Sequence, residues 1–439
     1  MKKNLLITLL LLFMQTCFAQ DFDTAKLNSY FKALADNNKF MGSVAVSKNG
    51  KIIYTRSIGF ADVENNIKLN DSTKYRIGSI TKTFTASLIL KAVEENKLLL
   101  SQTLDNYFPS IKNAEKITIS ELLYHRSGVH NFTDNADYLT WNTQPKTEQQ
   151  MVEIIAKGGS DFEPGSKLQY SNSNYILLTY ILEKIYDKPY AELLNKKIIK
   201  PLHLKNTYYG GKINIHNNEC YSYTYSNGIL RKENETDMSV PAGAGAIVST
   251  PTDLTKFANA LFSYKIINKK SLQQMETLKD NFGMGLIEAP FYDKKALGHT
   301  GGIDGFSSVF EYFPGDTLAY ALCSNASNMN NNDISIAVLS AVYNKPYNIP
   351  TFTSIQLTST ELDKYSGVYA SKQMPLKITI TKSGNTLVAQ ATGQPSFELE
   401  ATAKDTFKFE KAGIVLEFDP DKKEMILKQR GATYKFTKE

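Results

Sequence analysis

Cysteine is scarce in this sequence, with three in 439 residues, one of which (Cys17) lies close to the N-terminus. A disulfide scaffold is therefore excluded, and a chain of this length can bury a large core without cross-links. An excess of charge of one sign is also lacking, because 50 Lys and Arg face 44 Asp and Glu. The net charge of +6 is too thinly spread to indicate a nucleic-acid-binding protein.

Long apolar runs are missing after the first twenty residues, so we expect no transmembrane helix there. Near the N-terminus, two lysines precede an apolar run over residues 5–14, and residues 17–19 resemble a signal-peptidase site. This pattern predicts a signal peptide, residues 1–19, and export to the periplasm or secretion. An uncleaved signal that anchors the protein in the membrane is the alternative.

What the sequence contains is an ordinary globular composition, 42% hydrophobic and 21% charged. Apolar residues at helical spacing predict helices, and two β-rich runs joined by Asn49-Gly50 predict a hairpin. A small-residue turn is expected at 241–248. The predicted helices cover 23–37, 81–97, 117–124, 175–186 and a segment opening at 250–251, and the predicted strands cover 43–48, 51–56, 305–313 and 317–324.

The composition shifts near residue 345, where Pro346 and Pro350 indicate a linker over 346–360. Strand-like runs then alternate with turn residues about every ten residues, which is typical of a small antiparallel barrel or sandwich. These runs are 376–381, 386–390, 406–410, 414–418, 424–428 and 433–436. We therefore expect a main domain over 20–345 and an all-β domain over 361–439. In the main domain, Cys323 lies in an apolar run that predicts a buried strand and an inert thiol.

The most informative segment carries Ser79 and Lys82 in an S-x-x-K pattern, directly after Gly78. A serine hydroxyl needs a base, and a spacing of three places both side chains on one helical face. Lys82 can act as that base only if burial or a neighbouring cation lowers its pKa from about 10.4. A second copy, Ser29 and Lys32, lies in an amphipathic helix and is interpreted as a solvated surface pair.

Two further elements complete a candidate site. Tyr170-Ser-Asn172 offers a proton relay and an amide that can hold both a lysine and a substrate carbonyl. A second Tyr-Ser-Asn sequence, at 225–227, is interpreted as a turn. The segment 298–302, Gly-His-Thr-Gly-Gly, is expected to begin a strand over 303–310, with the N–H of Gly302 pairing with that of Ser79 in an oxyanion hole. His299 would supply a donor with pH-dependent charge.

In this order, the three elements resemble the serine β-lactamase and penicillin-binding-protein superfamily, most closely class C β-lactamases and related DD-peptidases and esterases. The resemblance covers about residues 23–345, and its further segments are 117–128, 164–175, 201–207 and 243–254. It implies an α+β fold, with an antiparallel sheet flanked by helices. The C-terminal part is similar to a lipocalin-like domain found on some members.

The resemblance implies a role for each site residue. Ser79 would be the acylated nucleophile, Lys82 its base or base partner, Tyr170 the proton shuttle and Asn172 the group that orients Lys82 and the substrate. The strand side of the cleft would be lined by His299, Thr300, Gly301 and Gly302. Many members have lysine where His299 stands. A largely neutral histidine makes D-amino-acid peptides and esters equal or better substrates than β-lactams.

Several alternatives stay open at this point. The first expectation is an exported serine hydrolase of the DD-carboxypeptidase, D-aminopeptidase or esterase kind, and the alternatives are a β-lactamase and a non-catalytic binder of cell-wall fragments. We expect neither a metal nor an organic cofactor, and His125 and His130 are interpreted as loop hydrogen-bonding residues. Asp304 either contacts substrate or caps a turn, and the segment 131–150 with Trp141 is either a lid or an anchored loop. The sequence does not indicate the oligomeric state.

Overall fold

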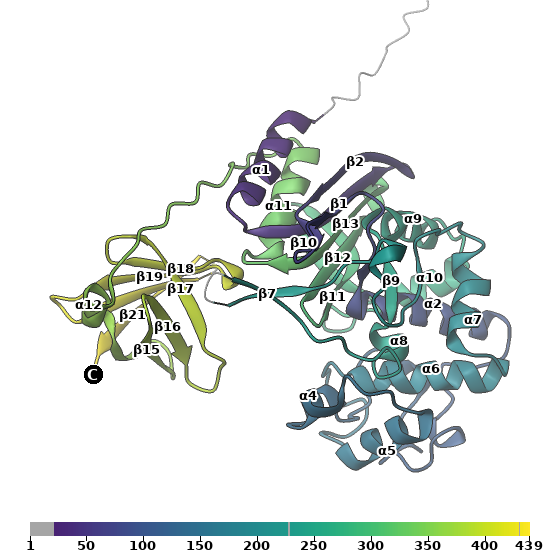
Figure 1. Ribbon diagram of the computed structural model, residues 1–439. Helices are drawn as coiled ribbons and strands as arrows, with labels where there is room; N and C mark the ends of the chain where they lie inside the picture. The colour runs from purple at the N-terminus through teal and green to yellow at the C-terminus, as the bar shows by residue number, and fades with distance from the viewer. Residues whose placement is uncertain (1–21, 227–228, 430) are drawn as a thin grey trace, which may run out of the picture.

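The structure, a computed structural model, describes residues 22–226, 229–429 and 431–439, so the predicted signal peptide lies outside the described residues (Figure 1). Its centre is a six-stranded antiparallel sheet in the order β10-β11-β12-β13-β1-β2. The strands are β1 (Phe40–Lys48), β2 (Lys51–Ile58), β10 (Ile287–Phe291), β11 (Lys294–Ile303), β12 (Phe306–Phe313) and β13 (Leu318–Ser327). The predicted hairpin is β1–β2, and both of its turn residues have positive φ, 52° at Asn49 and 74° at Gly50.

Helices cover both faces of this sheet, which explains why β13 is buried at nearly every position. Leu318, Tyr320 and Leu322 pack into the cluster formed with α1 (Thr24–Asp36) and α11 (Asn331–Val342). The alternate residues of the same strand, including Cys323, face the larger cluster under α2 (Thr81–Glu94) and α9 (Pro251–Phe262). Cys323 is therefore buried, as its sequence context indicates.

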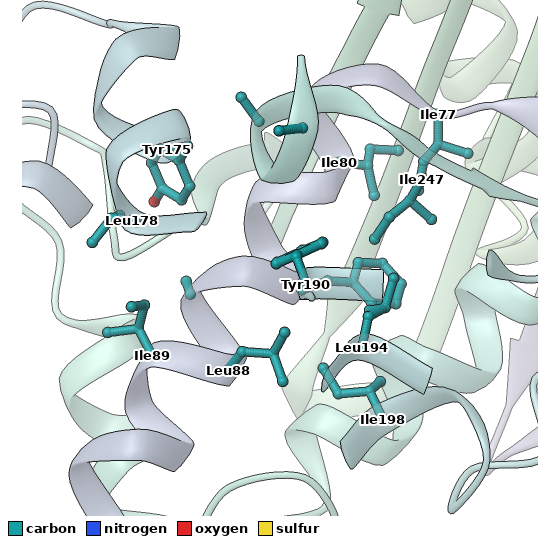
Figure 2. Close-up of a cluster of buried hydrophobic side chains, with 14 of the residues drawn as sticks. Ile77, Ile80, Leu88, Ile89, Tyr175, Leu178, Tyr190, Leu194, Ile198 and Ile247 are labelled. Atoms are coloured by element: carbon teal, nitrogen blue, oxygen red, sulfur yellow. The ribbon is translucent and has the colours of Figure 1, made fainter. Parts of the chain in front are cut away.

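The larger cluster holds α2 in the middle of the molecule, and Figure 2 shows side chains of α2, α6 (Asn172–Tyr186) and α7 (Tyr190–Leu194) meeting there. Because α2 is surrounded, eleven of its fourteen residues are buried, and these include Lys82 and several threonines. The small-residue segment expected to be a turn forms the short helix α8 (Ala242–Gly245) followed by β9 (Ile247–Ser249). A Cβ on Gly243 would lie 2.2 Å from Thr179 Oγ1, so glycine permits α8 to lie against α6.

The remaining elements of this part are short. The helices are α3 (Ile119–Leu123), α4 (Tyr138–Trp141), α5 (Glu148–Gly158) and α10 (Lys269–Glu276). The strands are β3 (Phe60–Asp62), β4 (Ile67–Lys68), β5 (Tyr75–Arg76), β6 (Tyr208–Tyr209), β7 (Tyr223–Ser226) and β8 (Ile229–Lys232).

One sequence prediction about the sheet is wrong. The glycine-rich segment 298–302 was expected to open a strand running to 310, but it forms the end of β11. The chain turns at Asp304, which has a φ of 51°, and returns as β12 from Phe306. Aspartate is one of the few residues besides glycine that tolerates this backbone conformation, so the turn falls there.

The C-terminal part is a closed antiparallel barrel of eight strands in sequence order, β14 to β21, closed by pairing of β14 with β21. Its interior is filled by apolar side chains such as Phe407, Leu416 and Phe436. The sequence missed two of its strands. The barrel strands are β14 (Gly367–Ala370), β15 (Lys377–Ser383), β16 (Thr386–Ala391), β17 (Phe397–Ala403), β18 (Thr406–Phe409), β19 (Ile414–Asp419), β20 (Glu424–Gln429) and β21 (Ala432–Lys438).

A segment without helix or strand, residues 345–358, leads from α11 to α12 (Ser359–Leu362) and the barrel. The barrel contacts the sheet part through an ion pair between Lys39 and Glu400. The connecting segment also contacts the barrel, since the backbone N–H of Ile355 donates to the carbonyl oxygen of Ala401. In the part of the chain that the structure describes, no helix has the length and apolar character needed to cross a bilayer.

Candidate active site

Ser79 lies at a junction between β5, a 3₁₀ turn (Gly78–Ile80) and α2. Gly78 has a φ of +51°, a conformation that side-chain-bearing residues rarely adopt. A Cβ at Gly78 would lie 2.7 Å from the backbone nitrogen of Gly302. Glycine at position 78 therefore lets the turn that carries Ser79 lie directly against the end of β11.

Lys82, one turn further along, points its amine at three oxygens. Its Nζ lies 3.0 Å from Ser79 Oγ, 2.8 Å from Asn172 Oδ1 and 2.8 Å from the carbonyl oxygen of Ala244. The side chain is fully buried, and this burial holds the pKa of Lys82 well below that of free lysine. A neutral amine can donate its two protons to Asn172 and Ala244, and its lone pair then faces the Ser79 hydroxyl.

The amide of Asn172 is held in the orientation that this contact requires. Asn131 Oδ1 accepts hydrogen bonds from the backbone N–H of Asn172 at 2.9 Å and from its Nδ2 at 3.2 Å. Asn172 Nδ2 also donates to Thr133 Oγ1 at 3.2 Å, so Oδ1 is left to face Lys82. Sequence reasoning did not single out Asn131 or Thr133, and it predicted only that the segment 131–150 is either a lid over the cleft or an anchored loop.

Tyr170 lies beside Ser79, whose side chain interacts with the phenol and slightly opposes the effect of burial on its pKa. Burial raises the pKa of Tyr170 above that of free tyrosine, so its phenol stays protonated over the physiological range. The Nζ of Lys82 is 4.9 Å from the centre of the Tyr170 ring. The three groups, Ser79, Lys82 and Tyr170, thus form one contact cluster.

His125 holds the backbone on both sides of Tyr170. Its Nδ1 accepts a hydrogen bond from the N–H of Ser171 at 3.1 Å, and its carbonyl oxygen accepts one from the N–H of Gln169 at 2.9 Å. Its ring stacks on that of Tyr170 with centres 4.3 Å apart. Burial, together with the nearby Lys82, lowers the pKa of His125 well below its usual value. His125 is therefore neutral, with Nδ1 as the acceptor.

His299 lies on β11 and is 4% exposed. Burial, followed by the charge of Lys82, lowers the pKa of His299 to about 4. Its Nδ1 lies 2.5 Å from the carbonyl oxygen of Thr300, which assigns the proton to Nδ1, and its ring centre is 6.4 Å from that of Tyr170. Where a lysine would place a fixed positive charge, this protein has a neutral imidazole at pH 7.

A pocket of about 480 Å³ opens in front of Ser79, and its lining includes Asn172 and Gly302. Two other residues that were predicted to line the strand side of the cleft, Thr300 and Gly301, do not line this pocket. Thr300 is exposed and lies outside the pocket lining, and the Cα–H of Gly301 points at the backbone of Ile77, since a Cβ there would lie 2.0 Å from the Ile77 oxygen. A larger, shallower hollow of about 680 Å³ beside Asp71 contains none of the predicted site residues.

Asp304, at the pocket wall, belongs to a buried ion pair. Its Oδ2 accepts from Arg76 Nη1 at 2.8 Å, and its Oδ1 accepts from the hydroxyl of Thr236 at 2.7 Å. Arg76 also contacts Glu235 Oε2 at 3.0 Å. Arg76 precedes Ser79 by three residues, so this network joins the turn that carries Ser79 to the β11–β12 turn and to the segment 235–236.

The other copies of the motifs lie elsewhere. Ser29 hydrogen-bonds the carbonyl of Ala25, and Lys32 pairs with Asp36 on the exposed side of α1. In the second Tyr-Ser-Asn copy, predicted to be a turn, Tyr225 and Ser226 form the end of β7, and residue 227 lies outside the described residues. His130 contacts Asp161 at 2.9 Å, whereas the His125 ring stacks on that of Tyr170.

Comparison with known proteins agrees with this geometry. The Beta-lactamase family model matches residues 27–344. The teichoic acid D-alanine hydrolase of Staphylococcus aureus (strain MRSA252) is 29% identical over 322 residues, which are 71% of this chain and 77% of that protein. The crystal structure of D-amino acid amidase from Ochrobactrum anthropi SV3 with D-phenylalanine has a TM-score of 0.64 at 26% identity and covers 73% of this chain and 99% of its own.

A third similarity concerns the fold alone. The octameric penicillin-binding protein homologue from Pyrococcus abyssi has a TM-score of 0.66 at 23% identity. This match covers 94% of the present chain and 99% of the other, and so it extends well beyond residues 27–344.

Proposed function

The chain belongs to the Beta-lactamase family and is a serine hydrolase, and on this premise we propose that it hydrolyses D-aminoacyl esters and amides through an acyl-enzyme on Ser79. The observation that carries the proposal is the contact between Ser79 Oγ and a buried lysine amine at 3.0 Å. Burial keeps the pKa of that amine low, so it can accept the serine proton.

In the acylation step, Ser79 Oγ attacks the substrate carbonyl carbon while its proton passes to Lys82 Nζ. The backbone N–H groups of Ser79 and Gly302 lie on the two facing segments and are proposed to hold the developing oxyanion. The proton then passes through Tyr170 to the leaving alcohol or amine, and the carbonyl–leaving-group bond breaks. Asn172 keeps the Lys82 amine aimed at Ser79 throughout.

In the deacylation step, a water molecule replaces the leaving group and attacks the ester carbonyl of the acyl-enzyme. Tyr170 and Lys82 take the proton of this water, and Ser79 regains a proton as its bond to the acyl carbon breaks. The products are the free acid, the alcohol or amine released earlier, and the regenerated enzyme.

The neutral state of His299 and the activities of the relatives both bear on the class of substrate. A neutral His299 leaves the strand side without the fixed positive charge that a substrate carboxylate would require, which disfavours β-lactams and carboxyl-terminal D-Ala-D-Ala peptides. The relatives named above are a D-alanine hydrolase and a D-amino acid amidase. D-aminoacyl groups on esters or amides satisfy both observations. Export, proposed from the N-terminal sequence pattern, would bring the enzyme to substrates outside the cytoplasm.

The proposal is tested with a fluorophosphonate probe and a substrate panel. The wild type is expected to become labelled on Ser79 and to hydrolyse D-alanine esters and anilides faster than nitrocefin. Absence of label on the wild type, or undiminished label on Ser79→Ala, would exclude the acyl-enzyme. Faster turnover of nitrocefin than of every D-aminoacyl substrate would instead support a β-lactamase.

A further inference from the structure

The charged side chains that line the pocket among the described residues are all acidic. Among the described residues that line the pocket, the charged ones are Glu233 and Asp304, with no lysine, arginine or histidine. Asp304 is neutralised by its buried ion pair with Arg76. Glu233 has no ion-pair partner among the described residues, so its carboxylate leaves the pocket with a net negative charge.

Glu233 is held in place by two contacts. Its Oε1 accepts a hydrogen bond from Thr224 Oγ1 at 2.5 Å. Its methylene stem packs on the turn after β11, because a Cβ at Gly305 would lie 3.1 Å from Glu233 Cγ. The second oxygen, Oε2, has no hydrogen-bond donor among the described residues, and it is left for a ligand.

The same wall carries the oxyanion side of the site. Gly305 follows Gly302 by three residues, and its N–H donates to Ser222 Oγ at 3.1 Å. The N–H of Glu233 in turn donates to the Ser222 carbonyl. Ser222 therefore ties the segment of Glu233 to the hairpin that carries Gly302, and a displacement of one would move the other.

We propose that Glu233 is the specificity-determining residue that receives the free ammonium group of the substrate's acyl part. This inference rests on the proposed function and adds to it the requirement for a cationic acyl group. An ammonium ion is attracted by an unpaired carboxylate in a partly closed pocket, whereas an N-acylated or carboxylate-bearing acyl group is not. The enzyme would accordingly act on aminoacyl groups with an unblocked amine.

The experiment compares two esters of nearly the same shape. In D-alanine methyl ester an ammonium group occupies the place that a methyl group occupies in methyl isobutyrate. We expect the ratio of kcat/KM for the first over the second to fall at least about tenfold in Glu233→Gln, the effect of losing a hydrogen bond to a charged group. Glu288→Gln, which removes a partly buried carboxylate on β10 that pairs with Lys295 on β11, serves as the matched control and should keep the wild-type ratio.

A charge-reversed variant gives an independent readout. Glu233→Lys should lower the same ratio further and should raise the relative kcat/KM for monomethyl methylmalonate, whose carboxylate replaces the ammonium. A ratio in Glu233→Gln equal to that of the wild type, or an equal loss on both esters, would overturn the inference. If Ser79 reacts with fluorophosphonate and the esters are turned over, such a result refutes the role of Glu233 alone. If Ser79 does not react, the proposed function and the inference both fail.

Discussion

Replacement of Gly78 by alanine tests whether the close contact between the Ser79 turn and β11 matters for activity. The new Cβ would lie 2.7 Å from the nitrogen and 2.8 Å from the carbonyl oxygen of Gly302. Ordinary van der Waals contact begins at 3.4 Å. The two segments must therefore separate by about 0.7 Å, and both of the atoms that meet the Cβ belong to backbone, which cannot rotate away as a side chain can.

Two effects are expected from this change. Alanine at a φ of +51° costs about 1–2 kcal/mol of stability through backbone strain. The separation also moves the Gly302 N–H away from the position where the oxyanion would form, and a shift approaching 1 Å typically costs about 10²-fold in rate. We therefore expect kcat/KM for D-alanine methyl ester to fall by about two orders of magnitude.

Gly50→Ala is the matched control for the strain alone. Gly50 has a φ of +74° in the β1–β2 turn, and a Cβ there would meet nothing within 4 Å. Urea unfolding should show the loss from backbone strain in both variants and a larger loss in Gly78→Ala, where the clash with Gly302 adds to it, while only Gly78→Ala loses activity. Equal kcat/KM in the two variants would refute the argument that the approach of Gly78 to Gly302 builds the site.

Three further changes test the charges and contacts around Tyr170. Because burial lowers the pKa of Lys82, the rate of fluorophosphonate labelling should reach its plateau at a pH well below the range in which free lysine titrates. Lys82→Gln should label at least about 10²-fold more slowly. A wild-type rate that still rises through the range of free lysine, near about pH 10.4, would contradict this. His125→Phe keeps a ring beside Tyr170 but loses the acceptor for the Ser171 N–H, so kcat should fall about tenfold with little change in KM; a change in KM alone would contradict it. His299 has a folded-state pKa of about 4 and an unfolded value of about 6.5. The unfolded chain therefore binds the proton first, and up to about 3 kcal/mol of unfolding free energy is lost as pH falls from 6.5 to 4. Urea unfolding of His299→Gln should lack that part of the pH dependence.

The sequence predicts local features of this fold well where one short pattern determines them. Asn49-Gly50 fixes the β1–β2 turn because both positions require positive φ. The barrel strands β14 and β17 were missed, although β17 alternates apolar residues with polar ones, the pattern of a half-buried strand. Closure of the barrel by pairing of β14 with β21 could not be predicted, because pairing between distant segments leaves no local pattern in the sequence.

In the site, too, contacts set by a local pattern could be predicted, whereas contacts between distant segments could not. Ser79 and Lys82 are adjacent through helical spacing, which a sequence reveals directly. The oxygen of Ala244 and the amide of Asn131 also determine the environment of the site, but a backbone carbonyl has no sequence signature. Glu233 lies in a polar stretch that resembles any surface loop. It reaches the pocket wall only because its segment packs on the β11–β12 turn.

The neutral state of the groups around Tyr170 has a consequence for the order of proton transfers in the proposed mechanism. The pKa values of Lys82, His125 and His299 are all lowered by burial, so the resting site holds no cation to stabilise a phenolate on Tyr170. Tyr170 is accordingly suited to give up a proton only after one has arrived elsewhere. When Lys82 takes the proton of Ser79, an ammonium group forms 4.9 Å from the centre of the Tyr170 ring. This is the moment at which the acidity of the phenol is greatest, and it coincides with the arrival of the leaving group that needs the proton.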